Sequence, residues 1–317
     1  MDRSQLAFRI VVVAAIVAAF GQVTLGGVVR VTESGLGCPD WPLCHGLVIP
    51  PFEVETLIEY SHRLSASLLS VFVVGVAVLA SFRARKDRDR REVLVPALLA
   101  VGLVAVAAVL GGVTVLTELA WWVIVLHLAI AEALIAALIV AAVTGWDADE
   151  ASKRSRLEGS LYRGRDAVTV YAAFGVLAVM LFGSYMVGYG AGPACGTWPL
   201  CRGSLMPDGT AEALHMGHRF TVVVMTGLIL GTIPAARTRR RSDPLVALSA
   251  ALLLAALGAQ VLLGAITVWS GFAAEAKALH LSLATLVWIA LITMAALIYL
   301  PRRFSAAPMP ATARDGA

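Results

Sequence analysis

The sequence predicts an all-α integral membrane protein whose eight transmembrane helices form two tandem four-helix bundles in the same orientation. Hydrophobic residues make up 59% of the 317 positions and charged residues only 15%, whereas a soluble domain carries about 25% charged residues. The chain also contains eight apolar runs that are long enough to cross a bilayer. Motifs of the first half return in the second half at nearly constant spacing.

Each expected helix is an apolar run of roughly 20 residues, the length that spans a hydrocarbon core about 30 Å thick. The runs cover 8–30, 61–82, 93–116, 121–144, 166–189, 215–236, 244–268 and 275–299. The first run follows a charged start, as a signal peptide does. It is longer than the apolar part of a signal peptide and has no small-residue cleavage site, so we expect it to be a retained membrane span.

Basic residues predict the orientation, because cytoplasmic loops are enriched in Lys and Arg. They collect in the segments 83–91, 153–165 and 237–241 and in the tail after 301. We therefore expect a multi-pass protein of the cell membrane with both termini in the cytoplasm. The net charge of +4 is explained by these topology signals and by contacts with anionic lipid, and no nucleic-acid partner is expected.

Three motifs of the first half recur in the second half. Cys38-Pro-Asp-Trp-Pro-Leu-Cys44 returns as Cys195-Gly-Thr-Trp-Pro-Leu-Cys201, His62-Arg63 as His218-Arg219, and Leu126-His127-Leu128 as Leu279-His280-Leu281. The offsets of 157, 156 and 153 residues indicate a duplicated four-helix unit. The expected organisation is an N-terminal half 1–147, a cytoplasmic linker 148–165, a C-terminal half 166–303 and a disordered cytoplasmic tail 304–317.

The four repeated histidines are candidate haem ligands. They lie near the outer ends of helices that all run inward, so they share a similar depth: His62, His127, His218 and His280. Two histidines that project into a bundle core from facing helices are typical of axial haem ligation, which needs neutral imidazole. A single histidine would fit a structural role equally well. Zinc is a weaker candidate, because catalytic zinc sites combine His and carboxylate ligands at short spacing.

The odd-numbered helices share a pair of small residues near their outer ends. The pairs are Gly26-Gly27, Gly111-Gly112, Gly183-Ser184 and Gly264-Ala265. They are explained by close helix packing, or by the need to leave room for a flat macrocycle.

The two halves differ just before their first histidines. Glu59 precedes His62 by three residues, whereas His215 holds the equivalent place before His218. Residues three apart share a helix face, so we interpret Glu59 as a catalytic or gating carboxylate; the alternative is an exposed residue at the helix start that favours the dipole. His215 is a candidate to support His218, and His45 is expected in a loop.

Other charged residues have less specific predicted roles. Arg63 and Arg219 follow their histidines and are candidates to pair with haem propionates, or else to contact lipid headgroups. Glu132 lies within the fourth helix and is expected to pack against a polar partner rather than to react.

The four cysteines fall in two outer loops, on the side of the membrane where disulfides persist. The repeat favours pairing Cys38 with Cys44 and Cys195 with Cys201 over the two other connectivities. Such a bridge is explained as a structural staple or as a redox-active pair. Neither loop has the close CxxC spacing of zinc or iron–sulfur sites.

Together these motifs resemble the haem A synthase family. The resemblance covers nearly the whole chain and rests on the two Cys-x5-Cys loops and four histidine motifs: Glu59-Tyr-Ser-His62-Arg63, Leu126-His127-Leu128, Met216-Gly-His218-Arg219 and Leu279-His280-Leu281. Members of that family have eight helices in two halves, outer cysteine pairs and four histidines.

The resemblance implies that His62 and His127 hold the substrate haem O and that His218 and His280 ligate a resident haem b. The implied reaction oxidises the C8 methyl group of haem O to a formyl group by successive hydroxylations, with Glu59 as the catalytic carboxylate. The product, haem A, would supply cytochrome oxidase. Implied partners are a haem O synthase, an electron donor and oxidase assembly factors, and a homo-oligomer is compatible with the sequence.

Two other functions fit parts of the pattern. A dihaem electron carrier would hold permanent bis-histidine haems in both halves and would give Glu59 no special importance. A haem transporter or chaperone would use the duplicated halves and the outer loops to gate haem passage.

Overall fold

The computed structural model describes residues 3–86, 88–145, 167–240 and 244–300. Within these ranges the protein is helical: α1 (Arg3–Val31), α2 (Val54–Lys86), α3 (Leu94–Leu116), α4 (Trp121–Gly145), α6 (Ala167–Gly188), α7 (Thr210–Arg240), α8 (Pro244–Trp269) and α9 (Ala274–Tyr299), with two short 3-10 helices, η1 (Ser34–Leu36) and η2 (Arg88–Val93). The predicted linker 148–165 and tail 304–317 lie outside the described residues.

All eight α-helices are long and apolar enough to cross a membrane, which confirms the predicted all-α membrane protein. Helices satisfy their own backbone groups, which is required where lipid offers no hydrogen-bond partner. Three of them begin earlier than predicted, α1 at Arg3, α2 at Val54 and α7 at Thr210. The first turns of α2 and α7 carry Glu55 and Glu212, which interrupt the apolar pattern but favour a helix start through the dipole.

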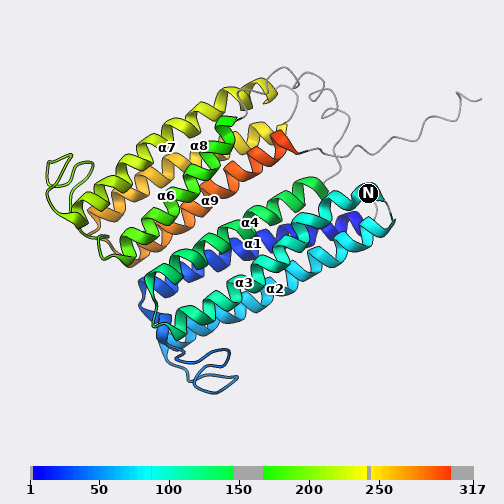
Figure 1. Ribbon diagram of the computed structural model, residues 1–317, viewed down its shortest axis with the longest axis horizontal. Coiled ribbons are helices and arrows are strands. Elements are labelled where there is room, and N and C mark those ends of the chain that lie inside the picture. The colour runs from blue at the N-terminus through cyan, green and yellow to red at the C-terminus, as the bar shows by residue number, and fades with distance from the viewer. Residues whose placement is uncertain (1–2, 87, 146–166, 241–243, 301–317) are drawn as a thin grey trace, which may run out of the picture.

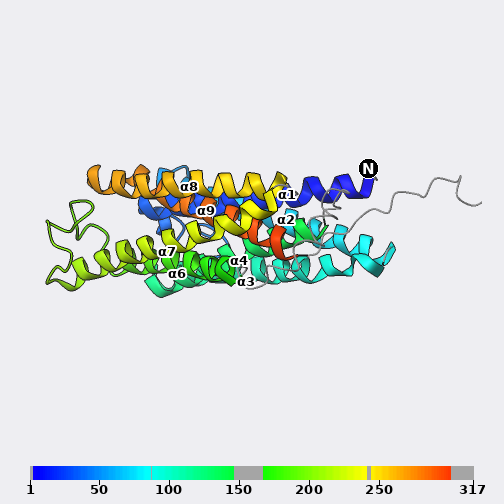
Figure 2. The same ribbon diagram turned by 90° about the horizontal axis from the view of Figure 1, so that it is seen from above.

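The helices gather in two groups, α1–α4 and α6–α9, which lie side by side (Figure 1). The loop between α1 and α2 and the loop between α6 and α7 lie at the same end of the molecule, and the view from above agrees (Figure 2). The two loops that carry the cysteines therefore face the same side.

A single buried core joins the two groups. Helix α1 buries one face, with residues three or four apart: Phe8, Val12, Ala15, Ala19, Val23 and Gly27. This spacing places them on one side of an α-helix. Across the boundary, α1 packs against α9, and α4 packs against both α6 and α9.

Two consecutive glycines let α1 approach neighbours on both sides. A Cβ atom at Gly26 would lie 3.1 Å from Cε1 of His62 in α2, and one at Gly27 would lie 3.1 Å from Cδ2 of Leu281 in α9. Both distances are tighter than ordinary van der Waals contact. Helix α1 therefore packs closely against helices of both groups.

A buried polar contact also joins the halves. Thr285 Oγ1 of α9 donates a hydrogen bond of 2.7 Å to Glu132 Oε1 of α4, and Trp288 Nε1 donates one of 3.0 Å to the Glu132 backbone oxygen. Glu132 is fully buried. The expectation that it packs against a polar partner is confirmed.

Replacing Thr285 by Val should destabilise the protein, because Glu132 Oε1 would lose a donor inside the membrane. We expect a loss of about 1–2 kcal/mol, measured as a lower Tm in detergent. Thr285→Ser keeps the hydroxyl and should melt close to the wild type. Equal Tm values for the Val and Ser variants would contradict this role of the hydrogen bond.

Candidate haem sites and their outer loops

Each of the four predicted ligand histidines packs its ring against a glycine of a neighbouring helix. A Cβ added to that glycine would lie 3.1–3.5 Å from the Cε1 atom of the imidazole. The pairs are Gly26 with His62, Gly111 with His127, Gly183 with His218, and Gly264 with His280. The small residues singled out in the sequence thus leave room for the histidine rings themselves.

The histidines are grouped as the repeat predicts. His62 interacts electrostatically with His127 in the first half, and His218 with His280 in the second. Among the described residues no group of three or more His, Cys, Asp or Glu side chains could hold a metal ion.

Three of the rings carry an unsatisfied polar atom. The Nδ1 atoms of His127, His218 and His280 are buried and have no hydrogen-bond partner. An unpaired buried polar atom costs about 1–3 kcal/mol, and such atoms are rare enough to need an explanation. A buried ring nitrogen that no protein group satisfies is free to bind a metal, so these three residues fit axial haem ligation.

Sequence reasoning missed two glutamines beside the histidines. Gln22 Nε2 lies 3.1 Å and 3.2 Å from the two ring nitrogens of His62, and its Oε1 accepts a hydrogen bond from Ser65. Gln260 Nε2 lies 3.5 Å from His280 Nε2. Each glutamine stands four residues before the glycine of its own helix. The available signal was an amide inside an apolar span, where polar residues are rare and functional.

The cysteines pair as predicted, Cys38 with Cys44 and Cys195 with Cys201. Each bridge closes a loop that turns back on itself, with a short backbone pairing of Cys44 with Leu47 and of Cys201 with Ser204. The turn uses left-handed backbone at His45 and Gly46 and at Arg202 and Gly203, where glycine is favoured. His45 lies in a loop, as expected.

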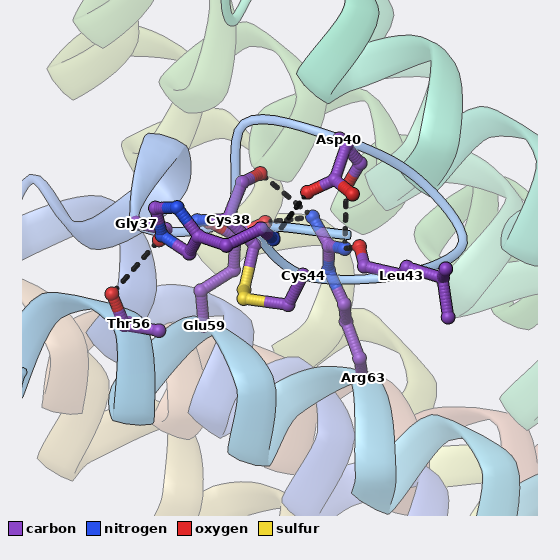
Figure 3. A network of polar contacts seen from close by, with 9 residues as sticks. Gly37, Cys38, Asp40, Leu43, Cys44, Thr56, Glu59 and Arg63 are labelled. Atoms are coloured by element: carbon purple, nitrogen blue, oxygen red, sulfur yellow. Dashed lines mark hydrogen bonds and ion pairs between the residues drawn. A yellow bond between two sulfur atoms is a disulfide. The ribbon is translucent and has the colours of Figure 1, made fainter. Parts of the chain in front are cut away.

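An arginine from the following helix holds each loop in place, and Figure 3 shows the first of them. Arg63 Nη1 donates to the backbone oxygens of Asp40 and Leu43 at 2.7 Å and 2.6 Å, and Arg63 Nη2 donates to that of Cys38 at 3.0 Å. These contacts fasten the disulfide loop to the helix that carries His62.

The second loop is held in the same way. Arg219 Nη1 donates to the backbone oxygens of Thr197 and Pro199 at 2.8 Å and 2.9 Å, and its Nη2 donates to that of Cys195 at 3.3 Å. Both arginines are thus engaged with loop carbonyls, and their pairing with propionates stays a prediction.

Glu59 lies between its arginine and the disulfide loop (Figure 3). It is 4% exposed. Glu59 Oε2 accepts the backbone N–H of Cys38 at 2.7 Å, and Oε1 forms an ion pair with Arg63. The interpretation of Glu59 as an exposed residue at the helix start is therefore wrong, because the carboxylate is buried. Its catalytic role stays a prediction.

His215 takes the corresponding place in the second half. It is also buried, and its Nε2 lies 3.1 Å from Arg219 Nη2, while its Nδ1 lies 3.3 Å from the Ala191 backbone oxygen. An arginine has only donors, so Nε2 accepts and Nδ1 carries the hydrogen. A neutral ring thus replaces the negative carboxylate, and His215 supports the arginine that holds the second disulfide loop.

Asp40 closes the first loop from within. Its carboxylate accepts the backbone N–H of Gly46 at 2.7 Å and that of His45 at 2.6 Å. The pKa of Asp40 lies below its ordinary value. The largest cause is the hydrogen bond from Gly46, and the hydrogen bond from His45 and the nearby charge of Arg63 lower the pKa further. In the second loop Thr197 Oγ1 accepts the N–H of Arg202 at 2.7 Å instead.

Asp40→Thr should remove a pH-dependent contribution to loop stability. Because the folded-state pKa is lowered, the carboxylate stabilises the loop above its ordinary pKa near 4, and this contribution disappears as the pH falls through the lowered value. The difference in Tm between wild type and Asp40→Thr should therefore shrink between pH 6 and about pH 3. For Thr197→Ala the difference should not vary with pH, and parallel pH profiles for the two variants would refute the prediction.

The chain is similar in sequence to known proteins. The family model COX15-CtaA, described as cytochrome oxidase assembly protein, matches residues 9–56 and 51–292. A protein from Exiguobacterium sp. named "Heme A synthase" is 32% identical over 211 residues, which cover 65% of this chain and 64% of that protein. The aligned part thus spans less than two thirds of that relative.

Further relatives carry the same name. The "Heme A synthase" of Halalkalibacterium halodurans is 32% identical over 65% of this chain and 68% of its own length. That of Geobacillus thermodenitrificans is 28% identical over 77% of each chain. The family match extends over most of the chain, including all four histidines and both disulfide loops, so this protein belongs to the COX15-CtaA family of cytochrome oxidase assembly proteins.

Proposed function

We propose that the protein is a haem A synthase, an oxidoreductase that converts the C8 methyl group of haem O to a formyl group by successive hydroxylations. The observation that carries this proposal is a pair of matched two-histidine sites, only one of which has a buried carboxylate one turn before its first histidine. Two identical tasks would not require this difference. The name shared by the relatives supports the same activity.

The second half is proposed to hold a resident haem b between His218 and His280. Its support is the lack of a carboxylate at this site, where His215 stands instead of Glu59, and the two unsatisfied Nδ1 atoms. When bound, haem iron would supply the electron-transfer and oxidising chemistry that side chains lack. The protein residues orient the macrocycle and exclude water from it.

The first half is proposed to hold haem O between His62 and His127, with Glu59 as the catalytic carboxylate. Glu59 stands one helical turn before His62 and is therefore on an adjacent part of the helix surface. A carboxylate at this place can take up or release a proton at Oε1 or Oε2 when its contact with Arg63 or with the Cys38 N–H loosens. The disulfide loop, which Glu59 holds, would then respond to the same event.

The proposed setting is the cell membrane, with both termini in the cytoplasm and the disulfide loops on the outer face. The arginine-rich segments support this orientation. Proposed partners are a haem O synthase, which would supply the substrate, and an electron donor. A hydroxylation that takes one oxygen atom from O2 and releases the other as water consumes two electrons and two protons.

A dihaem electron carrier remains the second candidate, because one observation favours it. The glycine contacts and disulfide loops are nearly the same in both halves, as two permanent haems would require. The carrier and the synthase differ in what they predict for Glu59 and for the exchange of haem.

The first test is haem extraction and mass analysis of protein from cells that co-express a haem O synthase. We expect haem A or its hydroxylated precursor in the wild type. In Glu59→Gln the amide can still accept the Cys38 N–H but holds no negative charge, so product should fall about 100-fold or more while haem O accumulates. His215→Gln disturbs the corresponding contact with Arg219 in the second half and should lower the amount of product far less than Glu59→Gln does. Two equivalents of unmodified haem b in every sample would establish the carrier.

A second test separates the two sites by their ligands. His218→Ala and His280→Ala should lose the tightly bound haem b, seen as a lower haem-to-protein ratio by absorbance. His62→Ala and His127→Ala should keep it and lose haem O binding. The reverse pattern would exchange the assignments of the two halves.

A further inference from the structure

Arg30 has no anionic partner in the part of the chain that the structure describes. It lies in the last turn of α1, at the end of the molecule that carries the disulfide loops. Its Nη1 donates to Ser184 Oγ at 3.0 Å and its Nη2 donates to the Ser184 backbone oxygen at 3.3 Å. Both acceptors are neutral, and among the described residues no carboxylate lies within ion-pair distance of it. A partly buried charge without a counter-ion is unfavourable.

The position of Ser184 connects this cation to the second site. Ser184 is buried and directly follows Gly183, the glycine against which the His218 ring packs. On α1 itself, Gly27 packs against Leu281, the neighbour of His280. The guanidinium therefore lies against α6, one residue from the glycine that packs on His218. The helix that carries Arg30 also packs against α9, the helix of His280.

Arg30 has no arginine at the corresponding position of the second half. Gly26 corresponds to Gly183, so Arg30 corresponds to Val187 of α6. The second half thus lacks an arginine of its own at this level. Arg63 and Arg219 each donate to three backbone oxygens of their disulfide loops, whereas Arg30 donates to one backbone oxygen and one hydroxyl.

We propose that Arg30 binds a carboxylate of the tetrapyrrole held by His218 and His280, so that the N-terminal half contributes a binding residue to the site of the C-terminal half. This inference rests on the proposed function, in which that ligand is haem b. A haem carries two propionate carboxylates, and a guanidinium offers them a planar, paired set of donors. The charge-assisted contact would replace or add to the neutral contact with Ser184.

The test uses full-length protein produced with haem b and without a haem O synthase. The rate at which haem passes to excess apomyoglobin is measured for wild type, Arg30→Met and Arg30→Lys. Loss of a hydrogen bond to a charged group should release haem about tenfold faster or more in Arg30→Met. Arg30→Lys keeps the charge but not the planar donors and should fall between the two.

A purely structural clasp between Arg30 and Ser184 makes a different prediction, which the haem-free protein tests. If the guanidinium serves a carboxylate, haem-free Arg30→Met should be at least as stable as the haem-free wild type, because an uncompensated charge has been removed. Ser184→Ala should release haem at the wild-type rate. A clasp would instead lower the Tm of both haem-free variants, and that result would overturn the proposal.

Two further outcomes separate this proposal from its foundation. Lys277 of α9 lies one turn before His280. If Lys277→Met releases haem fast and Arg30→Met releases it at the wild-type rate, the cation that binds the haem carboxylate is Lys277, and the proposed role of Arg30 is overturned. Wild-type protein that retains no haem b would overturn the proposed function as well. If the wild type retains haem b and Arg30→Met releases it equally slowly, only the role of Arg30 fails.

Discussion

The close contact between a histidine ring and a glycine of the adjacent helix is the constraint on which the structure depends. It occurs four times. At Gly26, Gly183 and Gly264 a Cβ would lie 3.1–3.2 Å from Cε1 of the imidazole, closer than ordinary contact, and at Gly111 it would lie in ordinary contact at 3.5 Å. The contact fixes where each ring lies and how near the two helices approach. Because the packed interior of a protein leaves few voids, the helix spacing and the ring position are set together.

Around this shared geometry the two halves differ in charge. Both loops are closed by a disulfide and held by an arginine through backbone oxygens. In the first half the arginine also binds a carboxylate, Glu59, whereas in the second it faces a neutral histidine, His215. This difference in charge supports the proposal that the proton-dependent chemistry takes place in the first half.

Much of this arrangement was predictable from the sequence. The length and apolarity of a segment identify a membrane helix, and the recurring motifs indicate which positions of the two halves correspond. The eight helices and both cysteine pairings were correctly predicted. The early starts of α2 and α7 were not, since a charged first turn lies outside the apolar pattern. The contacts of Arg63 with carbonyls and of Arg30 with Ser184 depend on how loops and halves pack, which residue spacing does not encode. Gln22 and Gln260 were visible as amides in apolar spans but were overlooked.

The consecutive glycines of α1 also limit how the sequence can change. Gly26 faces the histidine of its own half and Gly27 faces α9 of the other, so one short segment of backbone serves as a spacer for two sites. A bulkier residue at 27 would push α9 away and carry His280 with it. The two groups of helices therefore cannot change independently at this segment, and a substitution that suits one must be tolerated by the other.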